Sequence, residues 1–176
     1  MGLGYLVEGI LMQHALATLA LLLSLLAPSG EVEFDYWSGH PVGAWVKLKM
    51  EVETQGIKVV VDTQHTLLQL TAEKALIERK SKVSTNGMEQ PESLEKEELL
   101  AGKDKDPVTI TREGDEEIEA GGKKLKCHWI EGTQKETHKV KYWVSKEISG
   151  GVAKAEVSGG DIPAPMKITA TAWGKK

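Results

Sequence analysis

The sequence predicts a mainly β protein, with about eight strands in an antiparallel sheet that is curved or shaped as a half-barrel. From Asp106 to Glu156, short segments of alternating apolar and polar residues are separated by glycine-rich or charged turns. This period of two, with turn residues between the segments, indicates a meander of antiparallel strands. Two further segments, 44–53 and 166–173, alternate in the same way. Together these observations favour one sheet with one buried face.

The composition permits a packed domain and excludes some classes of protein. Hydrophobic residues make up 40% and charged residues 27% of the chain, which argues against global disorder. A length of 176 residues is ordinary for one domain, which we expect to span 30–176. The 22 basic and 26 acidic residues give a net charge of -4, too balanced to predict nucleic acid as a partner.

The first 29 residues differ in composition from the rest of the chain. Ala15–Ala27 is an almost uninterrupted apolar run. As a helix it would be ~20 Å long, short of the ~30 Å hydrocarbon core of a membrane. Small residues follow it, so we predict a signal peptide over 1–29, cleaved near Ala27–Gly30, and an exported protein, periplasmic or extracellular. A signal peptide normally begins with basic residues, but here no basic residue precedes Lys47, and Glu8 is acidic. The alternative is therefore an N-terminal anchor that is not cleaved, and we expect contact with a membrane only through such an anchor.

Segments before the meander are interpreted in chain order. Residues 31–43 are aromatic and turn-rich, which predicts a short arm or helix packing an aromatic side chain on the sheet. Strands are expected at 44–53, 57–70 and 74–85, the last with helix as the competing interpretation because it contains Ala, Glu and Lys. The charged connection 86–106 predicts one or two helical turns after Pro91, with Ser93 as cap, that form a flap over a sheet end, or else a mobile loop.

No catalytic, cofactor or metal signature is found in the sequence. It contains no serine elbow, P-loop, dinucleotide fingerprint or paired-cysteine zinc motif, so we expect a non-enzyme without cofactor or metal. Cys127 and His128 are neighbours on a predicted strand and therefore point to opposite faces, which argues against a thiolate–imidazole pair. We expect Cys127 to be buried. The acidic run 115–119 is interpreted as a hairpin edge that resists aggregation rather than as a cation site.

A tryptophan accompanies lysine or threonine on the expected non-core face of three strands. If these strands are neighbours, that face is a basic, aromatic surface that could hold an amphiphile, a glycan or an acidic partner. The alternative is that each tryptophan covers a sheet end or packs under the flap, and that the lysines only increase solubility. The predicted ligand-binding residues are Trp45, Trp143, Trp173, Lys47 and Lys141.

Residues 44–157 resemble a group of uncharacterised secreted bacterial β-domains. The likeness is carried by GDEEIEAGGKKLKCHWIEG and KVKYWVSKEISGGVAKAEV, which show an acidic strand, a glycine turn, a K-x-x-C strand and a W-x-S strand. This resemblance implies no activity. More remotely, the strand count and the lack of catalytic groups are similar to periplasmic lipoprotein carriers, whose half-barrel sheets hold acyl chains. That likeness is architectural, and a shared fold does not establish a shared function.

We therefore expect an exported, non-enzymatic β-domain that binds a hydrophobic or amphiphilic ligand, such as a lipid or glycan, or an envelope protein, on its concave face. Two alternatives are an envelope-acting hydrolase with Asp115 or Glu117 as general base, and a purely structural envelope protein.

Overall fold

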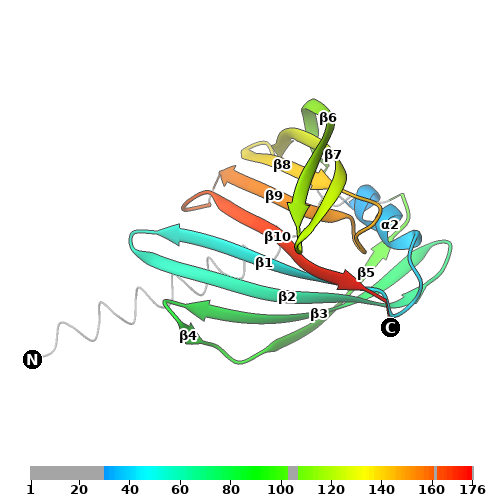
Figure 1. Ribbon diagram of the computed structural model, residues 1–176, viewed down its shortest axis with the longest axis horizontal. Helices are drawn as coiled ribbons and strands as arrows, with labels where there is room; N and C mark the ends of the chain where they lie inside the picture. The colour runs from blue at the N-terminus through cyan, green and yellow to red at the C-terminus, as the bar shows by residue number, and fades with distance from the viewer. Residues whose placement is uncertain (1–29, 103–106, 161, 176) are drawn as a thin grey trace, which may run out of the picture.

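The computed structural model describes residues 30–102, 107–160 and 162–175, and the predicted signal peptide or anchor at 1–29 lies outside them. The mainly β prediction is confirmed, because ten antiparallel strands form one curled sheet that does not close (Figure 1). Among the described residues, no helix has the length and apolar composition to cross a membrane. The elements are α2 (Gly30–Ser38), β1 (Trp45–Thr54), β2 (Ile57–Leu70), β3 (Lys74–Thr85), β4 (Met88–Glu89), β5 (Ser93–Leu100), β6 (Thr109–Ala120), β7 (Lys123–Gln134), β8 (His138–Val144), β9 (Val152–Gly159) and β10 (Met166–Gly174).

The first and last strands pair in the middle of the sheet. The strand order is β4-β3-β2-β1-β10-β9-β8-β7-β6, and β5 pairs with β3 beyond the point where β4 ends. In the part of the chain that the structure describes, the sheet therefore has two edges, one formed by β4 and β5 and the other by β6.

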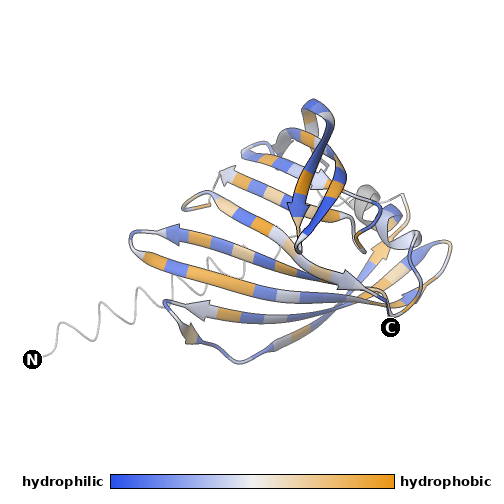
Figure 2. Ribbon diagram, in the orientation of Figure 1, coloured by the Kyte–Doolittle hydropathy of each residue, from blue (hydrophilic) through white to orange (hydrophobic). Residues whose placement is uncertain are grey.

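One face of the sheet carries the core and is referred to as the inner face. Met50 on β1 lies opposite Val61 on β2 and Ile168 on β10, and all three are buried. Figure 2 shows the apolar and polar positions alternating along these strands. Buried and exposed residues on β1 and β2 thus alternate with the pleat of the sheet, as predicted. The opposite face of the sheet is referred to as the outer face. Further buried inner-face side chains are Val46, Leu48, Val52, Ile77, Val83, Val140, Tyr142, Ala155 and Val157.

Helix α2 links two distant parts of the sheet at one end of the curl. Phe34 and Trp37 are buried in the core, and α2 contacts β3 and β5. On its other side, the ring of Trp37 lies against Gly150 and that of Tyr36 against Gly151, in the connection between β8 and β9. The predicted helix with an aromatic side chain packed on the sheet is therefore present.

Two segments that contain Glu and Lys form strands. Lys74–Thr85 forms β3, which is the interpretation that the sequence favoured. The prediction of helical turns after Pro91 is wrong, because Ser93–Leu100 forms β5. This strand pairs with β3 over eight positions, and each strand supplies charges that the other neutralises. Pairing across the sheet thus overrides the helix propensity of the segment.

The hairpin of β6 and β7 extends past β8 and bends back over the sheet (Figure 1). β7 pairs with β8 only through His128–Gln134, so the rest of β7 has β6 as its one partner strand among the described residues. The turn at Gly121 and Gly122 has positive φ at both residues, and Gly121 lies against Trp173 of β10. The tip of the hairpin therefore reaches the middle of the sheet.

Candidate functional site

A cluster of five polar side chains interrupts the apolar inner face near the β5 edge. On β2 and β3 the cluster residues occupy every second position along the strand, so they lie on the same face as core residues such as Val61 and Ile77. On β5, Glu97 lies opposite Ile77. The cluster, named the inner polar cluster, consists of Thr63, His65, Arg79, Ser81 and Glu97.

Two side-chain interactions join members of this cluster across neighbouring strands. An Arg79 guanidinium nitrogen lies 2.5 Å from Glu97 Oε2, and the two side chains are 14% and 21% exposed. Ser81 Oγ donates a hydrogen bond to Thr63 Oγ1 at 3.1 Å. Little of either side chain reaches water, so solvent weakens the attraction between the two charges less than at an exposed ion pair. Exposure of the cluster is greater at the β5 edge, at Arg79 and Glu97, than at Thr63, His65 and Ser81.

His65 is the buried ionisable ring of the cluster. Its residue is 4% exposed and lies opposite Arg79 on β3 and Val46 on β1. Burial, and then the positive charge of Arg79, lower the pKa of His65 to about 3. The imidazole is therefore neutral at ordinary pH. Its Nε2 has no hydrogen-bond partner among the described residues, which is rare and costly for a buried polar atom.

The two hydroxyl groups of the cluster are paired with each other. Ser81 donates to Thr63, so its hydroxyl is not engaged with the imidazole of His65. Within residues 30–102, 107–160 and 162–175, no three His, Cys, Asp or Glu side chains are grouped so that they could hold a metal ion. What the cluster offers is hydrogen-bonding capacity embedded in an apolar surface.

A second feature is a hollow of about 570 Å³ beside α2. Its lining includes Tyr36, His40 and Lys146. Burial, followed by the charges of Cys127 and Asp35, raises the pKa of Tyr36. His40 Nδ1 lies 3.5 Å from Ser149 Oγ, which is long for a hydrogen bond. At this separation, Ser149 and His40 are not arranged as a nucleophile and its general base.

Trp45 and Lys47, two of the predicted ligand-binding residues, lie together on the outer face. The Lys47 ammonium is 5.9 Å from the centre of the Trp45 ring. The indole is partly exposed and lies over Gly174, its partner on β10. This pair is separated from β8 by β10 and β9.

Trp143 and Lys141 form a second, covered group on the outer face of β8. The Lys141 ammonium lies 4.7 Å from the ring centre of Trp143 and 4.4 Å from that of Trp129. Trp143 is only 5% exposed, and its Nε1 donates to a carboxylate oxygen of Glu116 on β6. The hairpin therefore covers this tryptophan.

Trp173 does not share a face with Trp45. The β1–β10 register shifts between Lys47 and Leu48, so that Trp173 lies opposite Val46 while Trp45 lies opposite Gly174. An extra residue in one strand moves all later side chains to the other face. The five predicted residues thus form two separate pairs and one isolated tryptophan, and the structure does not bring them into one surface.

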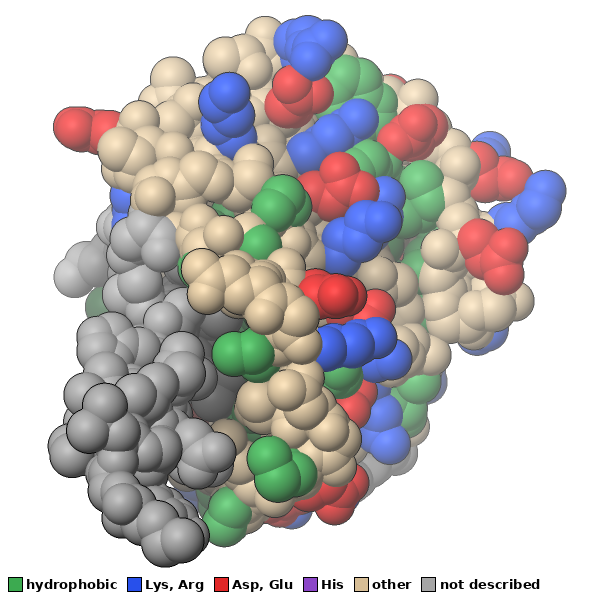
Figure 3. All heavy atoms as spheres, turned by 90° about the vertical axis from the view of Figure 1, so that its left-hand side faces the viewer, with side chains coloured by type: hydrophobic (Ala, Val, Ile, Leu, Met, Phe, Trp, Pro, Cys, Tyr) green, Lys and Arg blue, Asp and Glu red, His purple; other side chains and the backbone are tan. Residues whose placement is uncertain are grey.

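The outer face is also not uniformly basic. Lys49 and Lys58 both pair with Glu51, at 3.2 and 3.4 Å, and Lys154 pairs with Glu156 at 2.8 Å. The side of the molecule seen in Figure 3 shows lysine and arginine beside aspartate and glutamate, with no large field of one sign. Lysines of the outer face are therefore neutralised by acids on the same strand or on the neighbouring strand.

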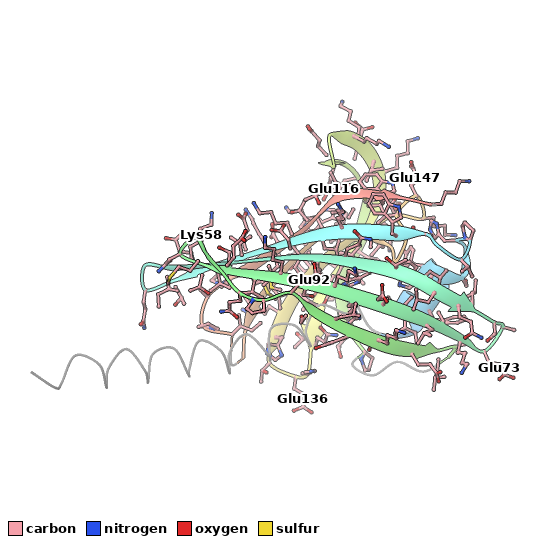
Figure 4. The ribbon with its side chains drawn as sticks, turned by 90° about the horizontal axis from the view of Figure 1, so that it is seen from below. Lys58, Glu73, Glu92, Glu116, Glu136 and Glu147 are labelled. Atoms are coloured by element: carbon pink, nitrogen blue, oxygen red, sulfur yellow. The ribbon has the colours of Figure 1, made fainter. Side chains whose placement is uncertain are left out.

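The structure confirms the opposite orientations of Cys127 and His128. Cys127 is buried, whereas His128 is exposed with its Nδ1 3.1 Å from Asp115 Oδ1. Burial, and then the charges of Glu116 and Glu147, raise the pKa of Cys127. Both glutamates lie on the same side of the sheet in Figure 4. The thiol is therefore protonated and shielded.

The acidic run of β6 makes local contacts along the hairpin. Glu117 pairs with Lys124 at 3.2 Å, Asp115 faces His128, and Glu116 accepts from Trp143. These carboxylates point to both sides of the strand, and their partners differ. The arrangement agrees with an acidic hairpin edge.

No protein-family model, no curated protein and no solved structure matches this chain. The function is therefore argued from the geometry alone. Sequence reasoning missed the inner polar cluster, although Thr63 and His65 fall on the same alternating positions as Val61. Their spacing of two and four residues from Val61 was the signal that could have placed both side chains on the core face.

Proposed function

We propose that this domain is an exported, non-enzymatic carrier that binds a single-chain amphiphile on its inner face. The observation that carries the proposal is the combination of a long apolar face and one buried polar cluster at the open edge of that same face. An amphiphile has the matching division between an apolar chain and a polar head.

The apolar part of the face supplies the affinity for a chain. Val46, Leu48 and Met50 continue across the sheet into Ala170 and Ile168 on β10. Burying each methylene group of a ligand contributes about 0.8 kcal/mol. The sheet is unclosed, so its two edges are not joined by hydrogen bonds and a ligand can enter between them without breaking a strand pair.

Binding of a glycan or a protein by the outer face receives less support, because the hairpin covers Trp143 and because Trp173 does not share a face with Trp45. A hydrolase is not favoured, since neither Asp115 nor Glu117 lines a described hollow.

The test is quenching of tryptophan fluorescence by a monoacylglycerol that carries a doxyl group on its chain, added to the purified chain. We expect saturable quenching, because Trp37 lies in the core beside the inner face. The outer-face variants Trp45→Phe and Lys47→Gln should retain the same affinity. Loss of binding in these two variants would place the ligand on the outer face, and absence of quenching in the unaltered chain would reject the proposal.

A further inference from the structure

We infer that the amphiphile carried by this domain has an uncharged, hydrogen-bonding head group, such as a hydroxyl, and that the inner polar cluster holds it. This inference rests on the proposed function and adds the chemical class of the ligand. Long-chain alcohols and monoacylglycerols belong to this class, whereas fatty acids and phosphate esters do not.

The charges of the cluster disfavour an anionic head. The positive charge of Arg79 is already compensated by Glu97 at 2.5 Å. Glu95 lies opposite Arg79 on β5 and adds a second carboxylate at the same edge. A ligand carboxylate placed there would meet Glu97 at a poorly exposed site, where repulsion between like charges is stronger than in water, and the exposed Glu95 at the same edge.

The hydrogen-bonding capacity of His65 suits a hydroxyl. A neutral imidazole has one nitrogen that donates and one that accepts, and either nitrogen can carry the proton. His65 Nε2 has no partner among the described residues. A hydroxyl both donates and accepts, so it satisfies this nitrogen in either tautomer, whereas a carboxylate can only accept.

The position of the cluster separates head from chain. Exposure falls from the β5 edge inward, from 21% and 14% for the Glu97 and Arg79 side chains to 4% for His65. Beyond His65 the same row continues into Val46, and the next row runs from Ser81 through Thr63 to Leu48. A head group at the cluster therefore leaves the chain over the apolar strands.

The experiment compares three probes of one chain length, dodecanol, dodecanoate and dodecane, as competitors of the doxyl-labelled monoacylglycerol on the purified full chain at pH 7.5. Dodecanol is expected to bind at least tenfold more tightly than dodecanoate, and more tightly than dodecane. The variant Glu97→Gln should reduce or reverse the preference for the alcohol, because it removes the carboxylate that pairs with Arg79 and so makes the cluster less negative. The matched control Glu98→Gln changes an exposed carboxylate on the opposite face of β5, paired with Lys74, and should keep the preference.

The readout is a ratio of two affinities within one protein, so a loss of stability that leaves the protein folded does not disturb it. If Glu97→Gln does not fold, Glu95→Gln, which keeps the Arg79–Glu97 pair, should shift the ratio in the same direction by less. Equal binding of all three probes overturns the inference but retains the amphiphile carrier, and tighter binding of dodecanoate overturns it as well. Failure of every probe to compete, in a protein that binds no labelled lipid, rejects the proposed function instead.

Discussion

The indole of Trp129 lies over Gly114, its cross-strand partner, and a Cβ at position 114 would stand 3.0 Å from three atoms of that ring. Trp45 lies over Gly174 in the same way. Aromatic rings thus cover strand positions where glycine supplies no side chain, an arrangement that compensates for the weakness of glycine in a sheet.

Gly114→Ala is expected to lower the free energy of unfolding by about 1–3 kcal/mol, because the added methyl group forces the indole of Trp129 out of its position. Urea unfolding followed by circular dichroism measures the change. Gly39→Ala is the control, since a Cβ there meets nothing within 4 Å. Equal effects of the two substitutions would contradict this account of Gly114.

Replacing either partner of the Arg79–Glu97 pair alone is expected to cost about 3–5 kcal/mol, because the remaining charge stays largely buried. The double variant Arg79→Met/Glu97→Leu should be much closer to the unaltered protein. Lys74–Glu98, with side chains 41% and 47% exposed, is the matched surface pair and should couple by no more than about 1 kcal/mol. Double-mutant cycles on both pairs give these energies. A coupling at Arg79–Glu97 no larger than at Lys74–Glu98 would refute the prediction.

His65 should make the protein less stable in mild acid. Its folded-state pKa of about 3 lies below the unfolded value of 6.5, so the unfolded chain binds the extra proton. The stability is complete above pH 6.5 and is lost as the pH falls toward 3, by at most about 1.4 kcal/mol per pH unit. Urea unfolding between pH 4.5 and 7.5 should show a steeper slope for the unaltered protein than for His65→Gln. Identical profiles for the two proteins would sink the idea.

Cys127 is expected to react with a thiol reagent such as DTNB many-fold more slowly in the native protein than in urea. Burial both shields the sulfur and raises the pKa of its thiol, which lowers the fraction of reactive thiolate. One rapidly modified thiol per native chain would show that the hairpin opens readily over this site.

Alternation predicted the strands that have one core face, such as β1 and β2, because burial on a pleated sheet repeats every two residues. It did not predict β5, whose Glu and Lys residues favour helix locally and become a strand only through pairing with Arg79 and Lys74 of β3. Nor could it place Trp173, because the register shift that turns this residue away from Trp45 depends on the fit of two distant strands. The inner polar cluster has the same origin, since it assembles from three strands and no single segment contains it.

The pairing of β1 with β10 has a consequence for how the chain acquires its structure. Strands β1 to β5 and β6 to β9 are each built from neighbours in the sequence, and among the described strands β10 pairs with one member of each group. Contacts between β1 and β10 form slowly, because a long loop must close first. Strand β10 is synthesised after all the strands that it joins, so the hydrogen-bonded ladder across the middle of the sheet is a late step in folding.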